Sequence, residues 1–166
     1  MALSELGPAE RFAAGAIGEP GDRRFYLHVV AGGEQHYLLA EKEQIRALAA
    51  QGLETLDDHG ISSDPEAVQR LAAQLEFDDP GDGNERFRVG SVSIGLGRSE
   101  LLTVEIEAVD ESDAISFVIA PEQFRAMARV ALDVVDAGRP TCPWCRLPMR
   151  EPEAHECPAR NGHGTR

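Results

Sequence analysis

The chain has 166 residues, of which 42% are hydrophobic and 27% are charged, and its formal net charge is −13. This length supports one sizeable core or two small packed units. The negative charge disfavours binding to nucleic acid or to an anionic membrane surface. The longest apolar runs have strand length, which excludes a membrane-spanning helix. The N-terminus lacks the features of a signal peptide, so we expect a cytoplasmic protein with reduced thiols.

A β-hairpin is the first element that the sequence predicts. Apolar segments 25–30 and 36–40 flank Gly32-Gly33, a pair typical of a two-residue hairpin turn. In that register His28 and His36 face opposite sides of the hairpin. We therefore expect them to be polar residues of a half-exposed sheet, and not two ligands of one metal.

Two helices are predicted next. In the first, apolar residues recur at spacings of three and four and form one stripe: Ile45, Leu48, Ala49, Gly52, Leu53 and Leu56. His59 follows this helix and is expected to be an exposed cap residue. The second helix is predicted over 64–76, with Asp64 as its N-cap and Pro65 in its first turn. Its expected buried face is Val68, Leu71, Ala72 and Leu75.

The acidic segment 78–84 is rich in glycine and proline and is expected to be a solvated linker. Its spacing does not match a calcium-binding EF-hand loop, because Pro80 and Val89 fall where ligands are needed. Four arginines near predicted strands are expected to pair with carboxylates, and the alternative is an anion site. They are Arg23, Arg24, Arg86 and Arg88.

A further strand and helix are predicted in the second half of the chain. Leu102, Val104 and Ile106 alternate with polar residues, as in a strand with one wet face. A helix then begins at Pro121 and ends before Gly138. Its apolar stripe is Phe124, Met127, Ala128, Ala131, Leu132 and Val135.

Two recurring strings indicate an internal duplication. The string Glu-Gln-apolar-Arg-Ala-apolar-Ala occurs at 43–49 and again at 122–128, and Phe-x-x-Gly occurs at 12–15 and 87–90. We interpret residues 1–138 as an α+β body of two β-β-β-α units, repeat one at 10–58 and repeat two at 86–138, joined by the helix at 64–76. The units are expected to form a mainly antiparallel sheet with pseudo-two-fold packing. The groove between the repeats is the default ligand site, and the strand order is left open.

The tail, residues 139–166, carries the clearest chemical motif. All three cysteines of the chain lie there, as Cys142-Pro-Trp-Cys145 and Cys157, and His155 stands two residues before the last. Three thiolates and one imidazole complete a tetrahedral zinc shell, so the sequence predicts a zinc knuckle with structural Zn²⁺. His163 is a possible substitute for His155. A redox pair, an unligated tail and a catalytic zinc are the alternatives.

These features together resemble an uncharacterised actinobacterial family, domain of unknown function 3090. The resemblance rests on Phe12-x-x-Gly15-x-x-Gly18-Glu-Pro-Gly, on residues 39–44, on Phe87-x-Val-Gly90 and on the cysteine-rich tail. It implies a cytoplasmic actinobacterial protein with a zinc tail, and it implies no activity. Arg146 stands where the family commonly has glycine.

The sequence has no catalytic constellation and no nucleotide-binding loop, so we predict no catalytic or cofactor-binding residues besides the metal ligands. The tail carries +2 and the body −15. We predict a non-enzymatic zinc-bound binding or adaptor protein with a protein partner. An enzyme or small-molecule binder that uses the groove between the repeats is the alternative.

Overall fold

The computed structural model describes residues 2–137, 141–147, 149 and 154–161. Six strands form one closed barrel in the order β1-β2-β3-β4-β5-β6. Their bounds are β1 Ala2–Ile17, β2 Arg24–Ala31, β3 Glu34–Ala40, β4 Phe87–Leu96, β5 Leu102–Ala108 and β6 Asp113–Ile119. The helices are α1 Lys42–Asp58, α2 Pro65–Gln74, α3 Pro121–Asp136 and the short α4 Pro158–Asn161. The α+β class and the mainly antiparallel sheet predicted from the sequence are confirmed.

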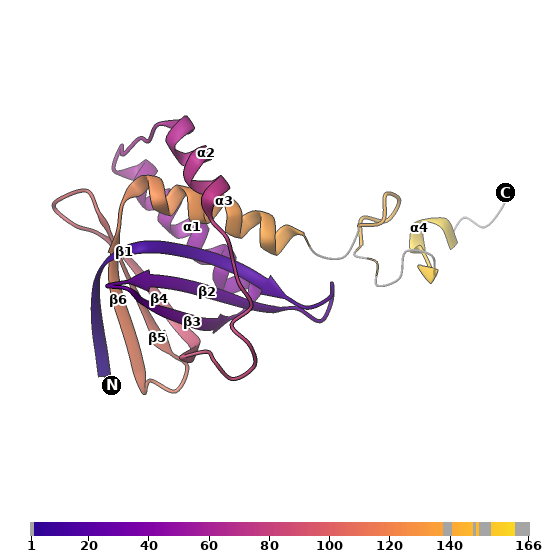
Figure 1. Cartoon of the computed structure of the whole chain (residues 1–166). Coiled ribbons are helices and arrows are strands. Elements are labelled where there is room, and N and C mark those ends of the chain that lie inside the picture. The colour runs from indigo at the N-terminus through magenta and orange to yellow at the C-terminus, as the bar shows by residue number, and fades with distance from the viewer. Residues whose placement is uncertain (1, 138–140, 148, 150–153, 162–166) are drawn as a thin grey trace.

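The barrel consists of two antiparallel three-stranded units that join through parallel pairs. Strands β1-β2-β3 and β4-β5-β6 each run antiparallel, whereas β3 pairs with β4 in parallel and β6 pairs with β1 in parallel. The first part of β1 lies against β6 and its second part against β2, so this one strand closes the barrel. Helices α1, α2 and α3 lie together on one side of it (Figure 1).

Local signals in the sequence predict the hairpin and the helices correctly. Gly32 and Gly33 have φ of 59° and 78°, which suits a tight hairpin turn. His28 pairs with Tyr37 in the expected register. The Asp64 side chain accepts a hydrogen bond from the Glu66 amide and caps α2 as predicted. The predicted face of α2, with Val68, Leu71, Ala72 and Leu75, is the less exposed side of the helix, and Leu75 packs against the core, but these residues are half-buried and none is fully buried.

One core fills the barrel and the space under the helices. The alternation predicted for β5 is confirmed, since Leu102, Val104 and Ile106 are fully buried. The rings of Phe12 and Phe117 meet edge to face, with centroids 5.0 Å apart, and so join the two halves. Apolar side chains therefore occupy the barrel interior between the halves.

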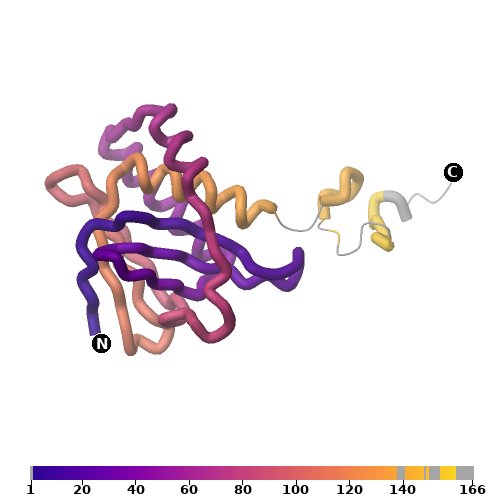
Figure 2. The backbone as a smooth tube through the Cα atoms, in the orientation of Figure 1, coloured from indigo at the N-terminus to yellow at the C-terminus, as the bar shows by residue number. Residues whose placement is uncertain are grey.

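The connection after α2 contains the acidic segment 78–84, which is mostly exposed as expected for a solvated linker, but the connection is also held against the barrel. It passes along the outer face of β1, β2 and β3, as the tube in Figure 2 shows. Phe77 from this segment stacks near Tyr26, with centroids 6.1 Å apart, and contacts the backbone of Gly15. Asp82 forms an ion pair with Arg24 at 3.0 Å. One aromatic ring thus anchors a segment whose composition alone suggests exposure.

Equivalent glutamines tie each helix to the first strand of the other half. Gln44 at the start of α1 accepts a hydrogen bond from the Glu41 amide at 2.8 Å and donates to the carbonyls of Val89 and Gly90. Both carbonyls lie at the β-bulge of β4. Gln123 of α3 accepts from the Ala120 amide in the same way.

Gln123 also donates to the carbonyls of Ala9 and Glu10, which lie at the bulge of β1. The contacts of Gln44 and Gln123 thus make Gly90 the counterpart of Glu10. The Phe-x-x-Gly strings at 12–15 and 87–90 therefore do not take equivalent places, and the pairing that we inferred from them is wrong.

Candidate metal centre

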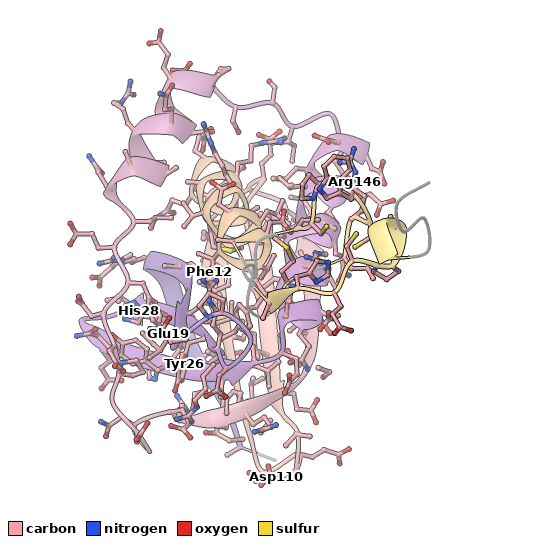
Figure 3. The ribbon with its side chains drawn as sticks, turned by 90° about the vertical axis from the view of Figure 1, so that its right-hand side faces the viewer. Phe12, Glu19, Tyr26, His28, Asp110 and Arg146 are labelled. Carbon is pink, nitrogen blue, oxygen red and sulfur yellow. The ribbon has the colours of Figure 1, made fainter. Side chains whose placement is uncertain are left out.

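The cysteine-rich tail forms a tight loop followed by a short helix. The Arg146 amide donates to the Cys142 carbonyl, and the Cys142 amide donates to the Leu147 carbonyl, both at 2.9 Å. These bonds bring the two ends of the Cys-Pro-Trp-Cys turn together. Arg146 has a φ of 63°, a left-handed conformation that explains why glycine suits this position. Figure 3 shows the loop that carries Arg146.

The three thiols and the imidazole converge on one point. The ligand atoms of Cys142, Cys145, His155 and Cys157 all lie within 4.8 Å of one another. The Sγ atoms of Cys142 and Cys157 are 3.7 Å apart, and Sγ of Cys145 lies 3.4 Å from Nε2 of His155. A tetrahedral zinc ion with Zn–S bonds of about 2.3 Å requires S–S separations of roughly 3.8 Å and slightly shorter S–N separations. The four residues therefore fit a zinc ion.

The distance between two of the sulfurs is too long for a disulfide bond. All three cysteines are free, and 3.7 Å between sulfurs is far longer than a disulfide bond of about 2.05 Å. Cys142 and Cys157 are buried, at 2% and 5% exposure, whereas Cys145 and His155 are half-buried. Two covered thiols in a four-ligand cluster are typical of a structural metal site, because a catalytic site keeps one position open.

The thiols have different protonation properties. Hydrogen bonds from the backbone amides of Cys145 and Trp144 stabilise the Cys142 thiolate and lower its pKa to about 6. The Leu147 amide acts in the same direction on Cys145. Burial and the neighbouring sulfurs of Cys142 and Cys157 outweigh that effect, so the pKa of the Cys145 thiol is raised. Crowded sulfurs resist ionising together, and a divalent cation removes that conflict.

The structure brings together all four predicted ligands. The substitute ligand His163 lies outside the described residues, as do parts of the tail on either side of the cluster. His59 is confirmed as the exposed C-cap of α1, with its Nδ1 2.8 Å from the Thr55 carbonyl oxygen.

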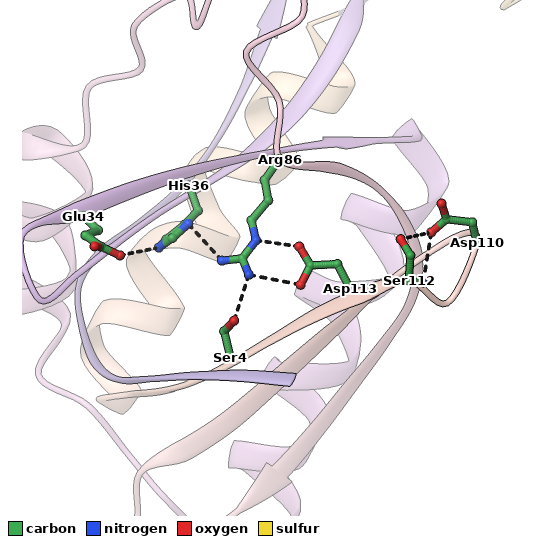
Figure 4. Close-up of polar contacts among 7 residues, drawn as sticks. All are labelled: Ser4, Glu34, His36, Arg86, Asp110, Ser112 and Asp113. Carbon is green, nitrogen blue, oxygen red and sulfur yellow. Dashed lines mark hydrogen bonds and ion pairs between the residues drawn. The ribbon is translucent and has the colours of Figure 1, made fainter. Parts of the chain in front are cut away.

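A second polar cluster lies at the barrel mouth, at the end where β3 and β6 begin (Figure 4). Arg86 donates to both carboxylate oxygens of Asp113, at 2.8 and 3.0 Å, and to the Ser4 hydroxyl at 2.8 Å. Its Nη1 lies 3.2 Å from Nδ1 of His36. Nε2 of His36 is 3.9 Å from a carboxylate oxygen of Glu34. Arg86 is thus the centre of the cluster, and it pairs with a carboxylate as predicted.

This cluster lacks the geometry of nucleophilic catalysis. The Ser4 hydroxyl and the Asp113 carboxylate both bond to Arg86, so His36 neither activates the serine nor receives support from the aspartate. Burial and the Arg86 charge lower the pKa of His36, and Arg86 lowers that of Asp113 through its hydrogen bonds. The neutral imidazole can accept a hydrogen bond from the guanidinium, and the arrangement joins three strands and the segment before β4.

His28 does not lie on a half-exposed face, contrary to our expectation. It is 3% exposed and stacks on Tyr37, with ring centroids 4.3 Å apart. It lies near Tyr26 (Figure 3), and the ring of Phe77 approaches it edge-on. Nε2 of His28 is 3.0 Å from Oε1 of Gln35. Burial lowers the pKa of His28, so the ring is a neutral part of an aromatic cluster.

The fold and the cluster define the chain as an α+β barrel protein with a C-terminal Cys₃His group that could hold a metal ion. Residues 5–157 match the family described as "Protein of unknown function (DUF3090)", and the chain belongs to that family. No curated protein and no solved structure matches the chain significantly. Within the part of the chain that the structure describes, no helix is both long and apolar enough to cross a membrane.

Proposed function

We propose that this protein is a non-enzymatic binding or adaptor protein whose tail is a zinc knuckle held by structural Zn²⁺. One observation carries the proposal, namely that the ligand atoms of the four tail residues have separations of 3.7 and 3.4 Å where a tetrahedral zinc ion needs them. The knuckle has almost no core of its own, so the metal would supply its folding energy.

The surface of the knuckle supports a protein partner. Trp144 is 64% exposed and Leu147 is 51% exposed, and both lie on the metal-binding loop. Exposed aromatic and aliphatic side chains next to arginine are typical of protein contact sites. The tail carries +2 on a body of −15, which argues against nucleic acid as the partner. The proposal also includes the cytoplasmic location and the actinobacterial origin that the sequence indicates, and it involves no membrane.

Metal analysis and partner capture test the two parts of this proposal separately. We expect one tightly held zinc per chain in the purified, untagged protein, and its loss in a Cys142→Ser, Cys145→Ser double variant. The variant Trp144→Ala should keep its zinc, because the indole is not a ligand, but should capture less partner from native lysate. A protein without zinc would contradict the metal assignment. Zinc without any reproducible partner would contradict the adaptor role alone.

We also infer that the two halves arose by duplication. Gln44 and Gln123 make the same three contacts, and two ion pairs between α1 and α3 are reciprocal. Arg46 pairs with Asp136 at 2.9 Å, and Arg125 pairs with Asp57 at 3.3 Å. The two arginines are 79 residues apart in the chain, and so are the two aspartates. This correspondence supports pseudo-two-fold packing.

The two glutamines provide a test of this symmetry. Gln44→Ala and Gln123→Ala should each cost about 1–2 kcal/mol of unfolding free energy, because each removes a helix cap and leaves bulge carbonyls without a donor. The costs should be similar and additive, since the sites share no partner. Urea unfolding followed by circular dichroism measures them, and a strongly unequal pair would count against equivalent roles.

The alternative function, a ligand in the groove between the repeats, is disfavoured at the barrel. Phe12 and Phe117 occupy the interior between the halves. Open space between the two halves includes a depression where α1, α2 and α3 meet and smaller ones beside β1 and β4.

A further inference from the structure

A cavity of about 590 Å³ that is broadly open to solvent lies where the end of α1, the start of α2 and one face of α3 come together. This volume is within the range of small-molecule sites. Its lining includes the polar residues Ser62, Ser63, Arg125 and Arg129 and the apolar residues Ile61, Pro65 and Val68. None of its lining residues is a proposed metal ligand, so a role for this cavity does not depend on the proposed zinc knuckle.

Arg125 is held in place without any ligand. Its Nε donates to the Ser63 hydroxyl at 3.1 Å, and its Nη2 donates to the Asp57 carboxylate at 3.3 Å and to the Ile61 carbonyl. The side chain is only 19% exposed. A guanidinium fixed in this way loses little further entropy when it binds an anion, which favours binding.

Arg129 adds a second positive charge one helical turn further along α3. It forms no hydrogen bond or ion pair with any residue in the described part of the chain, and the Ser62 hydroxyl is likewise unpaired there. Like charges at positions i and i+4 of a helix repel each other. Asp57 compensates one of the two arginines, so the cavity lining keeps a net charge of +1 in a protein of net charge −13.

On the other side of the helix pair, the described residues show only part of this arrangement. The ion pair between Arg46 and Asp136 is the counterpart of that between Arg125 and Asp57. At the same offset of 79 residues, however, Ala50 stands where the second half has Arg129. Among the described residues, a helix such as α2 and the loop before it follow α1 but do not follow α3. The ion pair is therefore present on both sides of the α1–α3 pair, whereas the second arginine and the lining of the cavity are described on one side only.

We propose that this cavity binds a small organic anion, with a carboxylate or phosphate head on Arg129, Arg125 and Ser62 and a compact apolar body against Ile61 and Val68. Two guanidinium groups and a hydroxyl suit the oxygens of either head group. The apolar wall favours an organic anion over an inorganic one. A neutral molecule of the same shape would leave the net positive charge of the lining uncompensated and bind more weakly.

Amide NMR spectra of the zinc-loaded full chain test the proposal. The probes are phenyl phosphate and benzoate as organic anions, inorganic phosphate as a head group alone, and benzyl alcohol as the neutral analogue. We expect at least one organic anion to shift the amide signals of Ser62 and Ser63, and to bind more tightly than inorganic phosphate or benzyl alcohol. Arg129→Ala should weaken that binding at least about tenfold, and Arg129→Lys should weaken it less.

Arg46→Ala is the matched control, because it removes the reciprocal ion pair on the side without the cavity, and it should bind the anion as the wild type does. Arg129 is exposed, so its variants should keep dispersed spectra and remain interpretable. Benzyl alcohol that binds as well as the anions would overturn the proposal. It would also be overturned by an unchanged affinity in Arg129→Ala, or by no shift from any probe up to about 10 mM.

Discussion

The Cys142 thiol should be ionised at neutral pH even before any metal binds. Its pKa of about 6 follows from amide hydrogen bonds within the tail loop. At pH 7 such a thiol is about 90% thiolate, whereas an ordinary thiol with a pKa of about 8.5 is about 3% thiolate. Zinc binds the thiolate, so this one ligand avoids a proton penalty of about thirtyfold in apparent affinity. The raised pKa of Cys145 has the opposite effect on its own contribution.

The ultraviolet absorbance of thiolates in the metal-free full chain, followed against pH, measures this difference. We expect one thiol to titrate near pH 6 in the wild type and in Cys145→Ser, and this step to vanish in Cys142→Ser. A thiol that titrates near pH 6 requires that the tail loop keeps its amide hydrogen bonds to Cys142 without metal. If no thiol titrates below about pH 8, the loop forms only on zinc binding and the argument from the amides is refuted.

Three further predictions concern the stability of the fold and the zinc affinity of the tail. Burial and Arg86 lower the pKa of His36, so the folded state binds fewer protons than the unfolded state near that pKa. The contribution of His36 to the free energy of unfolding should therefore be fully present above about pH 6.5 and decrease as the pH falls below it. Urea midpoints at several pH values should show this dependence weakened in His36→Asn, whose side-chain oxygen can still accept from Arg86. In Gly15→Ala the new Cβ would lie 2.1 Å from the Phe77 ring, so the ring must move away and the free energy of unfolding should fall by about 2–3 kcal/mol. The Gly15→Ala, Phe77→Ala double variant should then unfold no more easily than Phe77→Ala. Additive losses in the double variant would contradict this packing. Arg146→Gly should relieve a left-handed residue and raise the apparent zinc affinity of the tail by about 1 kcal/mol in a chelator competition.

The parts of the fold that were predictable from the sequence depend on short-range patterns. The metal ligands lie within 16 consecutive residues, Cys142 to Cys157, and the spacing alone indicates their convergence. Gly32-Gly33 fixes the hairpin register, because both residues need positive φ. The stripe on each long helix follows from the 3.6-residue period, and most of its members, such as Ile45 and Phe124, are fully buried.

Barrel closure was not predictable, because it depends on pairs between distant segments. The pairing of β1 with β6 involves residues 2–8, where Gly7 and Pro8 read as a loop and no alternation is present. The pairing of β3 with β4 rests on two residue pairs only, Leu38 with Phe87 and Leu39 with Arg88. The burial of His28 was missed for a similar reason, since the ring that covers it comes from an acidic segment with a single aromatic residue.

The repeated string Glu-Gln-apolar-Arg-Ala acquires a physical meaning from the structure. Its glutamine links a helix start to the bulge of a strand in the other half, and its arginine forms an ion pair with the end of the opposite helix. Both are contacts between halves, so a single unit would lack the partners of its own most recognisable residues. The string therefore contains residues that join the two halves of the body. Arg129 has Ala50 at the same offset of 79 residues, so this arginine is specific to one side of the helix pair, and a binding role should be sought around it.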